Sequence, residues 1–420
     1  MADENSVKAS PVKLLFMAAA GVYLDGYQLS VIALAVLLMV PDLHLSTFQE
    51  SLVLGAVILG TIIGTISIGY LADLFGRRRI YIYNLAFFLL FGLISVLTSN
   101  FWVIIISRVL MGISVGADYP VSNSYIAEMA PKEVRGKYLS FSNVAFSLGS
   151  VTSIIVALIF FALNISADIG WRFMIGIGLI PAAVVLYMRL SMPESFRWEN
   201  VKGRVAGTKI VKDMFTGLGG KFTLLNALIW FLYDMVIYGV SLFVPTILKI
   251  IYGSNVPNVE NAIFSSIFLI VLLGSSILVM FIVDQTGRKI IQIIGFVGIG
   301  LFMILVPMAY SSLISLVMFL VIIEFFNGFS GTTVGMFPAE LAKTEFRASA
   351  YGFASMMGKI GALVGVLILG SSEIGASSLK MFIIFGVLMI LSALLSLLLV
   401  DTTHMDLDEL YKFKEKLSED

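Results

Sequence analysis

The chain has no cysteine and only two histidines among its 420 residues. The absence of cysteine excludes disulfides and thiolate metal sites, and it leaves the redox compartment undetermined. Because His44 lies in an expected loop and His404 in an expected tail, the sequence has no HExxH zinc site, and we predict neither a metal nor a cofactor. Charged residues make up only 13% of the chain, about half the share of soluble domains. The formal net charge is zero, which gives no argument for nucleic-acid binding.

Apolar runs of about 20 residues recur along the chain, each long enough to cross a bilayer as a helix. The sequence is 59% hydrophobic, and we predict an all-α membrane protein. Its twelve expected transmembrane helices lie at roughly residues 13–40, 48–73, 80–98, 101–128, 138–164, 170–191, 222–248, 258–284, 289–309, 311–337, 348–371 and 376–400. A longer polar stretch at 192–221 divides them. We therefore predict two six-helix bundles, 1–191 and 222–420, joined by a cytoplasmic loop.

Lysine and arginine are distributed unevenly over the predicted loops. Of the 27 such residues, only Arg172, Lys249 and Lys380 fall on one side of the membrane, and Arg108 and Lys359 fall within spans. Cytoplasmic loops of multi-pass proteins hold the excess of these residues. We therefore predict a cell-membrane protein, surrounded by the lipid bilayer, with both termini cytoplasmic.

A short signature occurs twice, about half a chain apart. Residues 69–79 read GYLADLFGRRR, and residues 284–289 read DQTGRK. A second motif, Ala-Glu followed by an arginine, recurs at nearly the same spacing. The paired positions are Asp73 and Asp284, Glu128 and Glu340, and Arg135 and Arg347. These repeats indicate a duplicated, pseudo-symmetric membrane protein, and such proteins are mostly transporters of small molecules.

The repeated motifs predict a gate at the cytoplasmic ends of the spans. Their glycines favour close helix packing and a tight turn, and their acids favour helix capping or pairing with arginines. We predict ion-pair latches that close the cytoplasmic side. The predicted gate residues are Gly69, Asp73, Gly76, Arg77, Glu128, Arg135, Asp284, Gly287, Arg288, Glu340 and Arg347.

Few ionisable side chains lie inside the predicted spans. Each costs about 2.5–3.5 kcal/mol at the bilayer centre, so we expect them to face the interior between the two halves. A carboxylic acid in a dry cavity holds its proton tightly, and a nearby cation weakens that hold, which suits a proton carrier. The predicted proton-coupling residues are Asp25, Arg108, Asp118, Asp234 and Glu324, and we expect Arg108 to pair with Asp25.

The signature at 69–79 resembles the loop-2/3 motif of the major facilitator superfamily. Together with the second copy, the twelve spans and the long central loop, the resemblance covers the whole chain. The segment PESFRW at 193–198 resembles the one that follows span six in sugar porters. The resemblance implies the major facilitator fold, in which two bundles rock about a central site. It also implies a monomer.

Several segments resemble the phosphate:proton symporter family more closely. They are GADYPVS at 116–122, WFLYD at 230–234 followed by YG at 238–239, PAE at 338–340 and GKIGA at 358–362. The resemblance implies a substrate and proton site lined by Asp118, Tyr119, Trp230, Asp234 and Lys359. The hydroxyl of Tyr119, the indole N–H of Trp230 and the ammonium of Lys359 are donors able to converge on an anion.

The chain departs from that family at three positions. Gln28 replaces the second acid of its span-one DxYD pattern, Leu148 falls at a span-five glutamine, and Gly331 falls at a span-ten asparagine. We predict that Gln28 and Asn327 contribute to the substrate site, Asn327 in place of a lost amide. Phosphate needs many hydrogen bonds to leave water, so these changes favour a larger, partly apolar anion. Glu324, if ionised, repels a dianion.

The sequence thus predicts a proton-coupled symporter of a small anion, either inorganic phosphate or an organic acid. The alternative is a proton-linked or facilitative carrier of a neutral solute such as a sugar. A sensor that transports nothing is disfavoured, because the tail 401–420 is too short for a sensing domain. The sequence contains no P-loop, nucleophile elbow or metal cluster, so we predict that the protein is not an enzyme and has no catalytic residues.

Overall fold

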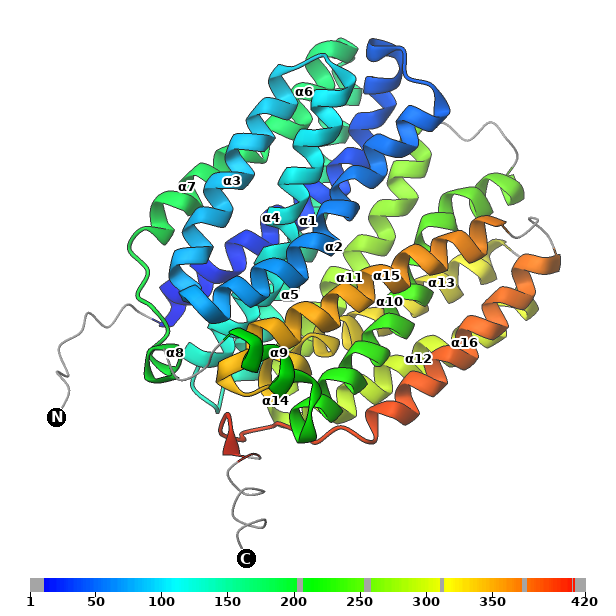
Figure 1. Ribbon diagram of the computed structural model, residues 1–420. Helices are drawn as coiled ribbons and strands as arrows, with labels where there is room; N and C mark the ends of the chain where they lie inside the picture. The colour runs from blue at the N-terminus through cyan, green and yellow to red at the C-terminus, as the bar shows by residue number, and fades with distance from the viewer. Residues whose placement is uncertain are drawn as a thin grey trace, which may run out of the picture.

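The computed structural model describes residues 11–201, 207–252, 258–309, 313–371, 376–409 and 411, and these ranges contain helices and no strand. Helices are expected here because a backbone surrounded by hydrocarbon must satisfy its own hydrogen bonds. Figure 1 shows two groups of long helices packed side by side, the N-terminal group in blue to green and the C-terminal group in green to red.

The N-terminal bundle consists of α1 (Pro11–Leu43), α2 (Thr47–Phe75), α3 (Arg77–Leu97), α4 (Phe101–Met129), α5 (Arg135–Ala162), α6 (Ala167–Ile177) and α7 (Leu179–Arg189). The helices α6 and α7 follow one another with only Gly178 between them, at a point where a Cβ would lie 2.7 Å from the side chains of Tyr27 and Gln28. The two helices together correspond to the sixth predicted span.

The C-terminal bundle consists of α10 (Gly217–Tyr252), α11 (Asn258–Thr286), α12 (Arg288–Ala309), α13 (Leu313–Val334), α14 (Met336–Leu341), the 3-10 turn η1 (Thr344–Phe346), α15 (Arg347–Ser371) and α16 (Ala376–Ser396). The short helices α8 (Phe196–Val201) and α9 (Gly207–Phe215) lie between the bundles in sequence, inside the stretch expected to be a loop.

The twelve predicted spans agree with this helix order. Ten segments of the described chain, from Ala19–Leu43 to Ile314–Leu341, are long and apolar enough to cross a membrane. The helices α15 and α16 occupy the last two predicted spans. The all-helical, twelve-span fold class is therefore confirmed.

Glycines bring pairs of helices into backbone contact. A Cβ at Gly112 of α4 would lie 2.3 Å from the Val57 carbonyl oxygen of α2, and one at Gly60 of α2 would lie 2.1 Å from the Val109 carbonyl oxygen of α4. Only glycine tolerates such an approach, so these positions hold α2 and α4 in direct backbone contact.

Both copies of the repeated signature form the same tight turn. Gly76 joins α2 to α3 at φ 103°, and Gly287 joins α11 to α12 at φ 95°. Positive φ favours glycine, because other residues have a Cβ that clashes there. The end of the molecule that carries these two turns is called the motif end below.

Candidate functional site

A cavity of about 50 Å³ lies between the two bundles and is called the central cavity. Its lining comes from both halves of the chain. The residues are Val22, Tyr119, Asn123, Leu139, Ser142, Asn143, Trp230, Gly331, Thr332, Gly335, Met336 and Tyr351. Two of the predicted substrate residues, Tyr119 and Trp230, are among them. A volume of this size holds a few water molecules or a small solute.

A buried cation lies beside the Tyr119 edge of this cavity. The ammonium Nζ of Lys359 is 3.6 Å from Asp234 Oδ2 and 3.4 Å from the Tyr238 hydroxyl, and it lies 5.7 Å from the centre of the Tyr119 ring. Charge-assisted hydrogen bonds are usually 2.7–2.9 Å long. The Lys359 side chain is only 11% exposed, so its charge is compensated by long contacts in a site largely closed to water.

Trp230 packs against a residue from α15 that also contacts the N-terminal half. Its ring meets that of Tyr351 edge to face, with centroids 5.4 Å apart. The Tyr351 hydroxyl accepts a hydrogen bond of 2.9 Å from Asn123 Nδ2 on α4. This contact joins the two halves across the central cavity.

Replacing Gly358 with alanine is expected to disturb this wall. A Cβ at Gly358 would lie 2.5 Å from Trp230 Cδ1 and 2.8 Å from Asp234 Oδ2. Overpacking costs about 1–3 kcal/mol of stability, so we expect the melting temperature of the full chain to fall by about 1–4 °C. Thermal unfolding of the detergent-solubilised protein measures this. Gly274→Ala is the matched control, because no atom of the described residues lies within 4 Å of a Cβ there; equal melting temperatures in both variants would contradict the prediction.

The predicted residues Asn327 and Glu324 form a polar group on α13. Asn327 accepts a 2.6 Å hydrogen bond from the Tyr233 hydroxyl and donates one of 2.8 Å to Glu324. A Cβ at Gly331 would lie 2.6 Å from that same hydroxyl. The amide of Asn327 is therefore engaged within the C-terminal half, and the Tyr233 hydroxyl lies against Gly331.

A second polar group lies inside the N-terminal half. Asp118 accepts a 3.1 Å hydrogen bond from Asn84 and lies 3.3 Å from Nη1 of Arg189. The guanidinium of Arg189 stacks on the Tyr81 ring at 3.6 Å. Sequence reasoning missed Arg189, because its position at the end of the sixth span is typical of a cytoplasmic boundary charge.

Asp25 is buried beside this group, and its Oδ2 has no hydrogen-bond partner within the described chain. One turn earlier on the same helix, a Cβ at Gly21 would lie 2.1 Å from Arg189 Nη2 and 2.3 Å from Asp118 Oδ2. The expected pairing of Arg108 with Asp25 is absent: Arg108 is fully buried and none of its side-chain nitrogens has a partner in the described ranges. The prediction required the first and fourth spans to turn these two side chains toward each other. In the structure the Arg108 guanidinium does not reach the Asp25 carboxylate.

Two expectations about the N-terminal half, for Gln28 and for Leu148, are corrected. Gln28 is fully buried and donates a 3.2 Å hydrogen bond to the Ile175 carbonyl of α6, away from the central cavity. Leu148 is 48% exposed and does not line the cavity. An amide from α5 does line it: Asn143 donates to Thr332 at 3.0 Å and to Ser276 at 3.2 Å, both in the other half. Asn143 was not predicted, because a lone amide in an apolar span gives no indication of the face on which it lies.

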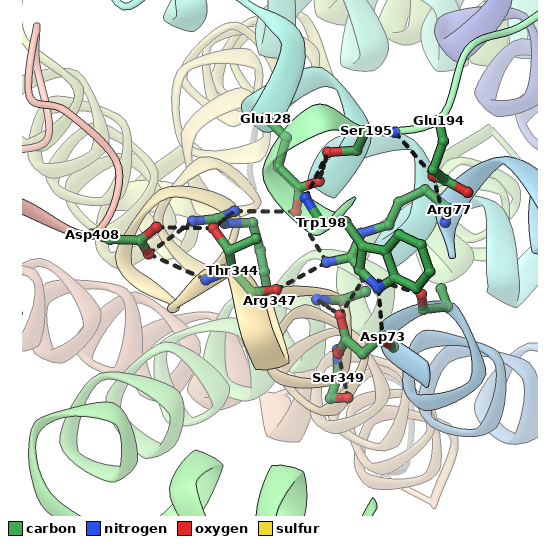
Figure 2. Close-up of polar contacts among 12 residues, drawn as sticks. Asp73, Arg77, Glu128, Glu194, Ser195, Trp198, Thr344, Arg347, Ser349 and Asp408 are labelled. Carbon is green, nitrogen blue, oxygen red and sulfur yellow. Dashed lines mark hydrogen bonds and ion pairs between the residues drawn. The ribbon is translucent and has the colours of Figure 1, made fainter. Parts of the chain in front are cut away.

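The first latch joins α2, α3 and α4 to the start of α15 (Figure 2). Arg77 lies 2.8 Å from Asp73 and 2.9 Å from Glu128, and Glu128 lies 3.1 Å from Arg347 of the other half. Asp73 also accepts hydrogen bonds from the backbone N–H groups of Ala348 and Ser349, at 3.3 and 2.7 Å. A carboxylate at a helix N-terminus is stabilised by the free N–H groups and by the helix dipole.

Several residues of the first latch were not predicted. The Ser195 hydroxyl donates to Glu128, and the Trp198 indole donates to the Asp73 carbonyl at 2.8 Å. Asp408, beyond the last helix, lies 3.3 Å from Arg347 and accepts from Thr344 (Figure 2). The sequence did draw attention to the segment at 193–198, through its resemblance to sugar porters. Nothing in the sequence except its charge pointed to Asp408.

The second latch repeats the first with the halves exchanged. Arg288 lies 3.1 Å from Asp284 and 3.0 Å from Glu340, and Glu340 lies 3.6 Å from Arg135 of the N-terminal half. Asp284 accepts hydrogen bonds from the backbone N–H groups of Gly136 and Lys137, at 3.0 and 2.8 Å, at the start of α5.

The two latches have the same logic. Each half supplies an aspartate that caps a helix of the other half and a glutamate that pairs with an arginine of the other half. The glutamates and arginines are almost fully buried. All these contacts lie at the motif end, which is closed in this structure.

The chain is similar to known membrane proteins. The family model for the Major Facilitator Superfamily matches residues 15–366. A repressible high-affinity phosphate permease of Neurospora crassa is 27% identical over 436 residues, covering 84% of this chain and 76% of the permease. A D-xylose transporter of Levilactobacillus brevis is 29% identical over 390 residues, covering 83% of this chain and 84% of that protein.

A solved structure shows the same fold. The proton:xylose symporter XylE from E. coli, bound to 6-bromo-6-deoxy-D-glucose, superposes with a TM-score of 0.83 at 21% identity. The superposition covers 96% of this chain and 98% of XylE.

Proposed function

The chain belongs to the Major Facilitator Superfamily, so it is a multi-pass membrane transporter rather than an enzyme. On that premise we propose that it is a proton-coupled symporter of a small anion, either inorganic phosphate or an organic acid. The observation that carries the proposal is the buried ammonium of Lys359 beside the central cavity, whose hydrogen-bond and ion-pair contacts are as long as 3.4 and 3.6 Å. An anion that reaches it gains a shorter, charge-assisted hydrogen bond.

The donors around the cavity suit an oxyanion. Besides Lys359, we assign substrate contacts to Tyr119, Trp230 and Asn143, which line the cavity from both halves. The hydroxyl of Tyr119 and the indole of Trp230 replace hydrogen bonds that the anion loses on leaving water, and the Asn143 amide does so when it releases a hydrogen-bond partner in the C-terminal half. Because the donors come from both halves, a bound anion favours an arrangement in which the halves are close together.

Proton coupling follows from the acids near the same site. With Asp25 and Asp234 ionised, an incoming anion is repelled, and a proton on one of them removes that repulsion. Proton and anion therefore each raise the affinity of the other, which is the thermodynamic requirement for symport. Asp25 is the acid we favour, because its Oδ2 has no hydrogen-bond partner among the described residues, whereas Asp118 is engaged with Asn84 and Arg189.

The latches supply the gate for alternating access. We assign to the two buried ion-pair networks the closure of the motif end while the opposite end admits solute. The halves that move are residues 1–191 and 222–420. The motif end faces the cytoplasm in this proposal, since nearly all lysines and arginines lie on that side in a cell-membrane protein.

A neutral solute such as a sugar is the second candidate. It is favoured by the amide and aromatic lining, Asn123, Asn143, Trp230 and Tyr351, and by the similarity to a D-xylose transporter. In a sugar carrier Lys359 serves only to compensate Asp234.

Lys359→Ala separates the two candidates. We expect the uptake of phosphate or of a carboxylate, driven by an inward proton gradient, to fall by at least tenfold. The reason is that the anion loses a charge-assisted contact of about 1.5–3 kcal/mol. The measurement is solute uptake in proteoliposomes containing the full chain, with phosphate, carboxylates and sugars compared. Lys380→Ala, outside the cavity, is the control. Sugar uptake that survives in Lys359→Ala would replace the anion proposal by the second candidate.

A further inference from the structure

A groove at the motif end lies between the end of α2, the start of α3 and α8, and it is called the α3 groove. Its volume is about 460 Å³. The residues that line it are Leu74, Phe75, Arg78, Arg79, Ile82, Tyr83, Glu194, Trp198 and Glu199. None of them lines the central cavity, so the α3 groove is a separate site.

Two guanidinium groups in the α3 groove have no carboxylate partner in the described part of the chain. Arg79 is exposed and makes no hydrogen bond or ion pair there, and the Arg78 side chain donates only to the Leu190 carbonyl, at 2.9 Å. The nearby carboxylate of Glu194 is engaged by the backbone N–H groups of Arg77, Arg78 and Ser195, at 2.9–3.1 Å. The groove thus has cationic charge available to a ligand.

The walls of the α3 groove continue into an apolar face. Phe75 is 52% exposed and Tyr83 66% exposed. Further along the same face of α3, the large apolar side chains Phe87, Leu90, Leu93 and Leu97 are exposed as well. On a membrane-spanning helix such a face meets lipid chains, and exposed aromatic residues lie at the level of the headgroups. The cationic groove therefore lies where a phospholipid places its phosphate.

We propose that the α3 groove binds an anionic membrane phospholipid. The phosphodiester lies against Arg78 and Arg79, and the acyl chains follow the exposed face of α3. A net negative headgroup is favoured over a zwitterionic one, because the groove offers two arginines and few free carboxylates. The Glu194 carboxylate is engaged by backbone N–H groups at the start of α3, which leaves Glu199 as the other lining carboxylate. Trp198 also donates to the Asp73 carbonyl, so the bound lipid lies directly behind the first latch.

The second repeat shows that the fold itself does not require the cation of Arg79. Lys289 stands in the place of Arg78, and its ammonium donates to the Leu397 carbonyl at 2.6 Å, as Arg78 does to Leu190. Ile290 and Ile294 stand in the places of Arg79 and Tyr83. The unpaired cation and the exposed aromatic residue therefore belong to the first repeat alone.

Native mass spectrometry of the full chain, titrated with phosphatidylglycerol and separately with phosphatidylcholine, tests the proposal. Wild type is expected to retain phosphatidylglycerol more tightly than phosphatidylcholine. Arg79→Gln is expected to weaken the first phosphatidylglycerol roughly five-fold and phosphatidylcholine by less, so that the preference for phosphatidylglycerol narrows. Arg79 makes no contact within the described chain that folding depends on, and an unchanged melting temperature verifies this.

Lys289→Gln is the matched control, because it removes one positive charge at the equivalent position of the second repeat. Its phosphatidylglycerol affinity is expected to stay within about two-fold of wild type, because the removed charge does not contact the bound lipid. Equal retention of the two lipids by wild type would overturn the proposal. So would equal weakening by Arg79→Gln and Lys289→Gln, which would indicate general surface attraction rather than a site.

Discussion

Replacing Glu128 with glutamine is expected to open the motif end and to raise the labelling rate of a cysteine placed behind the first latch by roughly 100-fold or more. Glu128 is buried between Arg77, at 2.9 Å, and Arg347, at 3.1 Å. A glutamine keeps the shape but leaves two buried guanidinium groups with less compensating charge. Breaking a buried pair in this way costs about 3–5 kcal/mol. Parting of the halves relieves that cost, because Arg347 then gains water.

The measurement uses the absence of native cysteine. Ala348→Cys is introduced alone, at a fully buried position where α15 meets α2: a Cβ at Gly69 would lie 2.5 Å from the Ala348 carbonyl oxygen. Its reaction with a water-soluble maleimide is followed with and without Glu128→Gln. The sulfur reacts only in molecules whose motif end is open.

Glu194→Gln is the control for this experiment. Glu194 lies in the same cluster, but the hydrogen bonds it accepts come from Arg77, Arg78 and Ser195, all within the N-terminal half and the segment after it. It is expected to leave labelling within a few-fold of wild type, because no contact between the halves is lost. Equal labelling in Glu128→Gln and wild type, or an equal rise in Glu194→Gln, would contradict the role of the first latch.

The helices were predictable because each one is specified by a long, continuous run of apolar residues in the sequence. Runs of about 20 apolar residues leave the chain few alternatives in hydrocarbon, so each expected span matches a helix, or a consecutive pair where Gly178 or Gly335 interrupts it. The latch residues were predictable as a set for a related reason. Two copies of one pattern at one offset specify which residues are equivalent.

The partners of those residues could not be predicted from the same pattern. Glu128 and Arg135 are seven positions apart and lie in one half, yet each pairs with the other half, Glu128 with Arg347 and Arg135 with Glu340. Equivalence under a repeat does not say whether symmetric groups meet within a copy or between copies. Only the packing of the two bundles decides that.

Helix rotation limited the prediction of the central site in the same way. A shift of five residues along α5 separates exposed Leu148 from Asn143, which lines the cavity and bonds to Thr332. Gln28 lies close in sequence to Asp25, but it bonds to the Ile175 carbonyl of α6 within its own half. Because these spans are apolar on nearly every face, the sequence gives little indication of which face meets the other half.

Asp25→Asn is expected to abolish accumulation driven by a proton gradient, with a fall of at least 100-fold in proton-driven uptake, while exchange of solute across the membrane continues. The asparagine fills the same buried space but has no titratable group that could take up and release a proton near neutral pH. Asp25 is 1% exposed and its Oδ2 has no partner in the described residues, so the substitution breaks no hydrogen bond of that oxygen. The defect is therefore expected in coupling rather than in folding.

Two assays on the same proteoliposomes separate these effects. Phosphate uptake under an inward proton gradient reports coupling, and counterflow at equal pH on both sides reports alternating access without a gradient. Asp118→Asn is the contrasting variant: it removes the charge 3.3 Å from Arg189 and is expected to lower thermal stability, because a buried guanidinium then lacks its anion. Wild-type accumulation in Asp25→Asn would show that another acid carries the proton. Loss of both uptake and counterflow would place Asp25 in solute binding instead.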